Sequence, residues 1–184
     1  MTGPFEAEIR SFVDDAQYAS LETYFRRESE FMGEECQETH YFDTDVDLRI
    51  QCNDHFAKIW MKKGAMHDMA REEHEVRFDR AQFGAAGAIF AALGYKVKIK
   101  WFRKRLSFRW GDVTVALDDT LGYGKILELE KMTTEENQGA ALADLKAKMA
   151  QLGVGITPKE DFDARFNDYA RNWEKRISDA QKAA

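Results

Sequence analysis

The chain has 184 residues with a formal net charge of −6, and 33% of its residues are charged. This length suits one domain with a sizeable core, and the acidic balance argues against general binding to nucleic acid or anionic membranes. Two cysteines, Cys36 and Cys52, are too few for a disulfide scaffold or a thiolate metal site. Because no secretory signal or membrane-spanning stretch is visible, we expect one cytoplasmic domain over residues 1–184.

The chain begins with a strand whose carboxylates alternate. Residues 4–10 place Glu6 and Glu8 two positions apart, and side chains two apart on a strand point to the same face. A helix is expected from Asp14 to Phe31, because apolar residues recur there at helical spacing and Gly33 can end it. The first strand therefore carries a pair of acidic side chains on one face.

Residues 47–63 predict a hairpin with a polar face. A turn signal at Asn53 to His55 separates two stretches of alternating character. Polar and basic side chains on alternate positions of these two strands include Arg49, Gln51, Lys58 and Lys62. The hairpin is therefore expected to present positive charge on one face.

Residues 71–110 predict two more charged strands and a helix between them. On the first strand, the side chains expected to share a face are Arg71, Glu73, Glu75 and Arg77. A helix is expected from Asp79, as its cap, to Gly94. A long basic strand then covers residues 95–110, with Arg103 and Arg105 on one face.

The last strand repeats the design of the first. Residues 122–124 form a flexible turn, after which Glu128 and Glu130 share one face of a strand. Leu127 and Leu129 take the other face, and this apolar surface has to be covered. Two such carboxylate pairs, if they meet, would offer four acidic donors suited to Mg²⁺ or Mn²⁺.

Two helices end the chain. Residues 133–152 begin with a capping signature and continue with helical spacing, and Thr157 predicts the cap of a final helix. We therefore expect strands over about residues 4–131 and C-terminal helices over about residues 134–180.

The signs of charge are sorted by strand: the first and last strands supply carboxylates and the middle strands supply most of the basic residues. If the sheet closes on itself, one face becomes a lumen. Unpaired charges in a dry lumen would each cost several kcal/mol, so such a lumen has to hold water, ions or a polyanion. Carboxylates with a metal, together with Arg and Lys, suit a chain of phosphates.

These motifs together resemble the CYTH domain, also called the triphosphate tunnel metalloenzyme superfamily, over about two thirds of the chain. In chain order they are Glu6-x-Glu8-x-Arg10, Tyr41-Phe42-Asp43-Thr44 before Leu48-Arg49, Lys62, Arg71-x-Glu73-x-Glu75, Arg103-x-Arg105, Val115-x-Leu117-Asp118, and Gly122-Tyr123-Gly124 before Glu128-x-Glu130. Each motif is weak alone, but their order and spacing are quite specific.

The resemblance implies an α+β fold: an eight-stranded antiparallel closed β-barrel that forms a tunnel, with helices packed outside. It also implies action on triphosphates with Mg²⁺ or Mn²⁺. The implied metal ligands and acidic lining are Glu6, Glu8, Glu73, Glu75, Asp118, Glu128 and Glu130. The implied phosphate-binding residues are Arg49, Lys62, Arg71, Arg103 and Arg105. The residues expected to serve catalysis are Glu6, Glu8, Arg10, Glu128 and Glu130.

Three positions depart from the family pattern. Arg10 stands where the family usually has lysine, and an arginine cannot readily act as a base. Gln51 replaces a frequent arginine and removes one positive charge, and Arg103 replaces a lysine. These departures bear on the activity rather than on the fold.

Three functions are compatible with these residues. The leading hypothesis is a metal-dependent triphosphatase that hydrolyses inorganic, thiamine or nucleoside triphosphate. The second is a class IV type adenylyl cyclase that converts ATP to cyclic AMP. The third is a non-catalytic module that binds polyphosphate or nucleotide. In each case the expected partner is a small triphosphate-containing molecule, and the protein is expected to be a monomer or a homodimer.

Overall fold

The computed structural model describes residues 5–63 and 72–183, which form eight β-strands and four α-helices in an α+β arrangement. The strands are β1 (Phe5–Val13), β2 (Glu30–Phe42), β3 (Asp47–Cys52), β4 (Phe56–Lys63), β5 (Glu72–Asp79), β6 (Val97–Trp110), β7 (Val113–Thr120) and β8 (Gly124–Thr133). The helices are α1 (Asp15–Glu28), α2 (Phe83–Ala92), α3 (Gln138–Gln151) and α4 (Lys159–Ala183), with short 3₁₀ turns at Arg80–Gln82 and Glu135–Asn137.

The strands form one antiparallel sheet in the order β1-β8-β7-β6-β2-β3-β4-β5. The expected eight strands and their antiparallel pairing are confirmed. Within the described residues, β1 and β5 stand at the two ends of this order, and closure into a barrel stays a prediction.

The chain divides into two compact units, Met1–Glu34 with Lys104–Asp168, and Glu35–Arg103 with Tyr169–Ala184. The strands β2 and β6 and the helix α4 each contribute residues to both units. A single domain over the whole chain stays a prediction, and the two units are described separately below.

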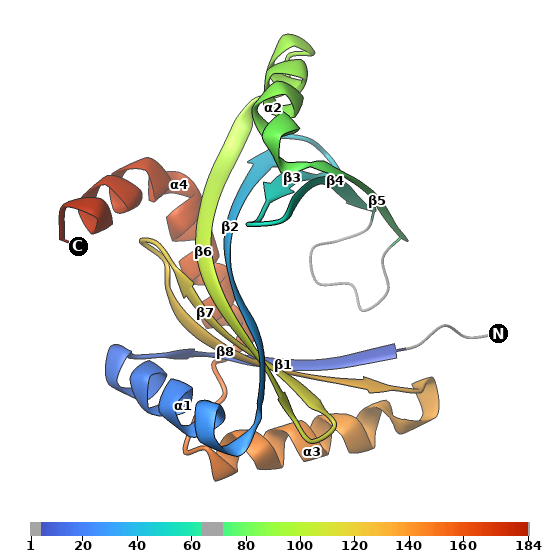
Figure 1. Cartoon of the computed structure of the whole chain (residues 1–184), viewed down its shortest axis with the longest axis vertical. Coiled ribbons are helices and arrows are strands. Elements are labelled where there is room, and N and C mark those ends of the chain that lie inside the picture. Colours follow the sequence, from blue (N-terminus) through green and yellow to red (C-terminus); the bar gives the residue numbers. More distant parts are fainter. Residues whose placement is uncertain (1–4, 64–71, 184) are drawn as a thin grey trace. The chain divides into compact units, whose positions relative to one another are not determined.

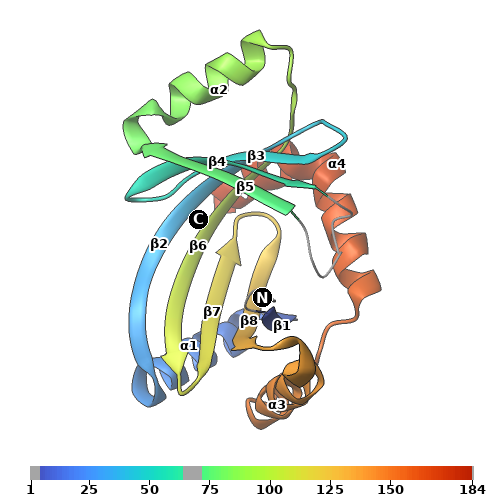
Figure 2. The same cartoon turned by 90° about the vertical axis from the view of Figure 1, so that its right-hand side faces the viewer.

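The first unit is built on the pairing of β1 with β8 and of β8 with β7. One face of these strands is apolar and lies against α1 and α3, as Figures 1 and 2 show. Leu127 and Leu129 on β8 are fully buried there with Leu145 of α3 and Phe25 of α1. The expected cover over the two leucines is therefore confirmed, and the opposite face of β1 and β8 is left to the acidic side chains.

Helix α1 begins where the sequence predicts and ends earlier. Asp14 accepts a hydrogen bond from the backbone of Gln17, whose side chain bonds back to Asp14 in a capping box. The helix ends at Glu28, and β2 starts at Glu30, so the expected end at Phe31 and Gly33 is wrong. Gly33 instead lies inside β2. The backbone of Ser29, at the end of α1, is already extended, so the strand can begin at the next residue.

The residue expected to cap the last helix has a different role. The Thr157 hydroxyl accepts a hydrogen bond of 3.0 Å from the Phe12 backbone and lies 2.8 Å from the Ser11 hydroxyl. Helix α4 starts two residues later, at Lys159. Thr157 therefore ties the connection between α3 and α4 to β1, because its side chain is used across the fold.

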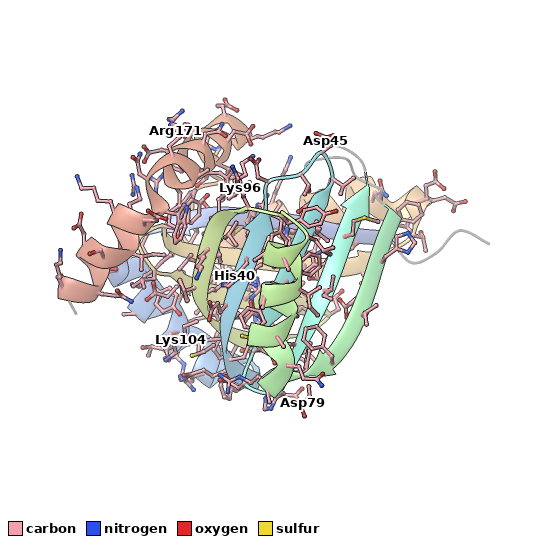
Figure 3. The ribbon with its side chains drawn as sticks, turned by 90° about the horizontal axis from the view of Figure 1, so that it is seen from above. His40, Asp45, Asp79, Lys96, Lys104 and Arg171 are labelled. Carbon is pink, nitrogen blue, oxygen red and sulfur yellow. The ribbon has the colours of Figure 1, made fainter. Side chains whose placement is uncertain are left out.

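The second unit contains β3, β4, β5 and α2, with parts of β2, β6 and α4. Figure 3 shows α2 lying across the sheet above His40, which meets the ring of Phe83 at 5.1 Å. The ring of Phe90 packs on Phe42 at 4.6 Å. The apolar helix α2 thus covers the face of β2 and β3 that is opposite Tyr41 and Arg49.

No helix among the described residues has the length and apolarity needed to cross a membrane.

We predict that Leu145→Ala lowers the free energy of unfolding by about 2–5 kcal/mol, because Leu145 is fully buried between α3 and the sheet. Leu142→Ala on the same helix is the matched control, since Leu142 is 36% exposed and should lose about 1 kcal/mol or less. Chemical denaturation of the three proteins measures both values. Equal losses for the two variants would contradict the packing of α3 described above.

Candidate functional site

Four glutamates gather on one face of the β1/β8 pair in the first unit. In the strand register Glu8 lies directly opposite Glu130, and Arg10 lies opposite Glu128. Glu6 is two positions from Glu8 on the same face, and its carboxyl group is hydrogen-bonded to Glu130. The two carboxylate pairs predicted from the first and last strands therefore do meet.

The crowding of these carboxyl groups changes how they hold protons. Loss of hydration, the hydrogen bond to Glu6 and the charges of Glu6, Glu128 and Glu8 raise the pKa of Glu130 to about 8. Loss of hydration and the charge of Glu128 also raise the pKa of Glu8, while Arg10 acts in the opposite direction. Near neutral pH the ligand-free cluster therefore retains a proton that a bound cation would displace.

Arg105 joins this face from β6, which follows β8 and β7 in the order of the sheet. Its Nε and Nη2 atoms each donate a 2.7 Å hydrogen bond to Asp118, and Nη2 lies 3.3 Å from Glu128. The Asp118 side chain is only 4% exposed, so this bidentate pair is largely removed from water. Removal of Arg105 alone would leave a buried carboxylate without its main counter-ion, which is strongly destabilising.

Arg10 is held more loosely than Arg105. Its Nη1 atom lies 3.8 Å from Glu8, and its guanidinium lies over the ring of Phe162 at 5.1 Å from the ring centre. Since an arginine stays charged at any physiological pH, Arg10 can bind an anion or orient a carboxylate but cannot serve as a base.

The donor chemistry of this face fits Mg²⁺ or Mn²⁺. The four glutamates Glu6, Glu8, Glu128 and Glu130 offer only oxygen donors, which these hard cations prefer. Across the described parts of the chain, no three histidine, cysteine or acidic side chains are already arranged to hold a metal ion.

The second unit holds Arg49 between aromatic and acidic neighbours. Its Nε and Nη2 atoms each donate a 2.6 Å hydrogen bond to Asp47, and Nη1 donates to the Tyr41 hydroxyl at 3.2 Å. The guanidinium also lies over the rings of Tyr41 and Trp60, at 4.2 and 4.5 Å. Arg49 is thus oriented from several directions before any phosphate binds.

Other predicted residues of the second unit are paired among themselves. Glu75 accepts hydrogen bonds from Lys58 at 2.8 Å and Arg77 at 2.6 Å, and these bonds lower the pKa of Glu75. Arg103 donates to the side-chain oxygen of Gln37. Glu75 is therefore engaged by cations of its own unit, and Arg103 donates to an amide oxygen of the same unit.

Three predicted residues are described only in part or not at all. Arg71 lies outside the described residues. For Lys62 and Glu73 only the backbone is described, where Lys62 pairs with Asp47 on one side and with Glu73 on the other. Their assigned roles stay predictions.

Sequence reasoning missed three partners of the predicted residues. Asp47 is two positions before Arg49 on β3, so the shared face of a strand could have pointed to it. Gln37 meets Arg103 across strands, and Phe162 reaches Arg10 from the last helix. Neither contact has a local sequence signal, because strand pairing and helix docking bring these residues together.

The sequence and the fold of the chain were compared with those of known proteins. No curated protein matches the sequence. A conserved hypothetical protein from Pyrococcus furiosus has a similar structure, with a TM-score of 0.65 and 22% identity over 84% of this chain and 96% of that one. A proposed adenylate cyclase from Vibrio parahaemolyticus has a TM-score of 0.63 and 19% identity, over 89% and 99% of the two chains.

A third similar structure is a proposed adenylyl cyclase from Hippeastrum, described as having a dominant triphosphatase activity. Its TM-score is 0.65 and its identity 17%, over 90% of this chain and 96% of that one. At these identities the likenesses show the fold. The CYTH domain matches residues 4–162, which include β1, β8 and all four clustered glutamates, and the chain therefore belongs to the CYTH domain family.

Proposed function

We propose that this protein is a divalent-metal-dependent triphosphatase that hydrolyses inorganic, thiamine or nucleoside triphosphate. The observation that carries the proposal is the meeting of Glu6, Glu8, Glu128 and Glu130 on one face of β1 and β8, beside Arg105. Four clustered carboxylates are costly to keep in a folded protein, and a cation that bridges them offsets this cost. Membership of the CYTH family supports the same reading.

Under this proposal Glu6, Glu8, Glu128 and Glu130 hold Mg²⁺ or Mn²⁺. The cation would neutralise charge on the phosphate oxygens and would make an attacking water molecule more acidic. Arg105 holds Glu128 and Asp118 in place, and Arg10 contributes a permanent positive charge next to Glu8. Positioning and charge neutralisation supply most of the rate enhancement in phosphoryl transfer.

The phosphate-binding role of the arginines has a specific feature. The donor atoms of Arg105, Arg49 and Arg103 are occupied by oxygens of their own unit, from Asp118, Asp47 and Gln37 respectively. A triphosphate that binds these arginines would have to compete with such partners for their N–H groups. Lys62 and Arg71 remain candidates for the same role, and closure of the sheet into a barrel is part of this proposal.

The alternatives differ in their products. The class IV type cyclase forms cyclic AMP and pyrophosphate from ATP, whereas the binding module forms no product. The protein from Hippeastrum, described as a proposed cyclase with dominant triphosphatase activity, supports placing hydrolysis first. Product analysis with Mg²⁺ or Mn²⁺ and, separately, inorganic triphosphate, ATP and thiamine triphosphate tests the proposal. Phosphate release supports it, and cyclic AMP or no product from any substrate overturns it.

We predict that Glu8→Gln and Glu130→Gln each reduce metal-dependent turnover by more than about 100-fold, because each removes a charged oxygen donor from the proposed metal site. Initial rates of phosphate release measure this. Glu22→Gln is the matched control, since Glu22 pairs with Arg26 on α1, away from the acidic face, and should keep the wild-type rate. Full activity in Glu8→Gln or Glu130→Gln would contradict the assigned metal ligands.

The raised pKa of Glu130 leads to a prediction about stability. Because the pKa of about 8 in the folded protein exceeds the ordinary value of 4.5, the metal-free folded protein keeps a proton that the unfolded chain releases. The free energy of unfolding in the presence of EDTA should therefore fall as the pH rises from 4.5 to 8. Denaturation at a series of pH values measures the slope.

Glu130→Gln isolates the contribution of this carboxyl group, because glutamine cannot ionise. The variant should show a shallower fall over the same pH interval than the wild-type protein. Parallel slopes for the two proteins would contradict the raised pKa of Glu130 in the folded protein.

A further inference from the structure

The start of helix α4 is fastened to β1 in the first unit. The Ser11 hydroxyl donates to the backbone oxygen of Gly155, and the Thr157 backbone donates back to Ser11 at 3.1 Å. The Phe12 backbone donates to the Thr157 hydroxyl at 3.0 Å. Ser11 is 1% exposed, so these bonds are shielded from water and fix where α4 leaves the sheet.

Ring and guanidinium contacts among five side chains also join β1 to the start of α4 and to Tyr123. The rings of Phe12 on β1 and Phe162 on α4 are stacked with centres 4.5 Å apart. The guanidinium of Arg10 lies over Phe162 at 5.1 Å, and that of Arg165 lies over Phe12 at 4.1 Å. Tyr123 meets Phe12 at 5.3 Å. Two aromatic rings thus carry one guanidinium each.

This stack lies on the acidic face of β1. Glu8, Arg10 and Phe12 occupy alternate positions of the strand and therefore share one face, and Arg10 is opposite Glu128. Phe162 contacts both Arg10 and Phe12, so the first turns of α4 reach onto that face. Phe162 of the last helix thereby contacts the guanidinium of Arg10, which lies next to the proposed metal site.

Arg10 needs such a contact to have a defined orientation. Its side chain is 45% exposed, and its ion pair with Glu8 spans 3.8 Å, which is a weak restraint on a long side chain. The ring of Phe162 restricts the guanidinium in the direction perpendicular to the ring plane. A charge that is oriented before the ligand arrives serves binding and catalysis better than a mobile one.

We propose that Phe162 of helix α4 is a positioning residue that orients the guanidinium of Arg10 toward the triphosphate. This inference rests on the proposed function. It makes α4 a part of the site, because the hydrogen bonds of Ser11 and Thr157 fix the helix that carries Phe162. Simple packing of Phe162 on Phe12 is the competing interpretation, and the two differ in whether the effect of Phe162 depends on Arg10.

A double-mutant cycle separates the two interpretations. Wild-type protein, Phe162→Leu, Arg10→Gln and the double variant are compared by kcat and KM for hydrolysis of inorganic triphosphate with Mg²⁺. Phe162→Leu should lower kcat/KM by about two- to fivefold, the range expected from loss of one cation–π contact. It should change the same kinetic parameter as Arg10→Gln does. In the Arg10→Gln background, Phe162→Leu should have no further effect.

Two control variants test the role of the ring. Phe162→Tyr keeps the aromatic face and should retain wild-type kcat/KM. Phe31→Leu removes a comparable contact, in which Arg26 lies 4.7 Å over the Phe31 ring, and should leave the kinetics unchanged. If Phe162→Leu does not fold, Phe162→Met takes its place in the cycle, because methionine keeps most of the side-chain volume without the ring.

The outcomes separate this inference from the proposed function. Normal wild-type turnover together with unchanged kinetics in Phe162→Leu, or with additive losses in the double variant, would overturn the positioning role alone. A wild-type protein that neither binds nor hydrolyses triphosphate would overturn the proposed function and this inference with it. Coupled losses that Phe162→Tyr avoids would support the inference.

Discussion

The central physical constraint in the first unit is the repulsion among carboxyl groups on one face of β1 and β8. Glu8 faces Glu130 across the strands, and Glu6 and Glu128 are close enough to raise the pKa of Glu130. The opposite face of the same strands is a buried apolar core against α1 and α3. Because that core fixes the register, the carboxyl groups cannot move apart by sliding the strands. A retained proton relieves the repulsion in the ligand-free protein, and a divalent cation would relieve it more fully.

The arginines proposed to bind phosphate have partners within the protein. Arg105 is held by Asp118 and Glu128, and Arg49 is held by Asp47 between two aromatic rings. These partners keep partly buried guanidinium groups paired, which would otherwise be costly. They also orient the arginines, so under the proposed function a triphosphate would have to compete with internal carboxylates for some of the N–H groups. The proposed affinity for triphosphate would therefore depend on the internal acids as well as on the basic residues.

Much of this arrangement follows from alternation along the strands. The acidic face of β1 and β8, its apolar reverse side and the hairpin of β3 and β4 all result from side chains that point to opposite faces in turn. That Glu8 lies opposite Glu130 could not be predicted from alternation alone, because it depends on the register of β1 and β8, which turns and packing set together. The sequence predicts too late an end for α1, because Gly33 resembles a helix terminator. In the structure, extended backbone at Ser29 ends the helix first.

Other features required tertiary structure. The sequence predicts that Thr157 caps a helix, but its hydroxyl accepts a hydrogen bond from β1 instead. Phe162 contacts Arg10 because the start of α4 is attached to β1. No local pattern connects residues so far apart in the chain. The same holds for Gln37 and Arg103, which meet across strands. Family resemblance supplied the expected roles of the charged residues, and the fold supplied the partners that hold them.

The most direct test of the account is the binding of Mn²⁺ to the purified protein, measured by calorimetry at neutral pH in two buffers with different enthalpies of ionisation. The account predicts that Mn²⁺ binds and releases close to one proton, because the pKa of Glu130 is about 8 in the metal-free protein and the metal displaces that proton. Absence of Mn²⁺ binding, or binding that releases no proton, would contradict the claim that the clustered glutamates of β1 and β8 form the metal site.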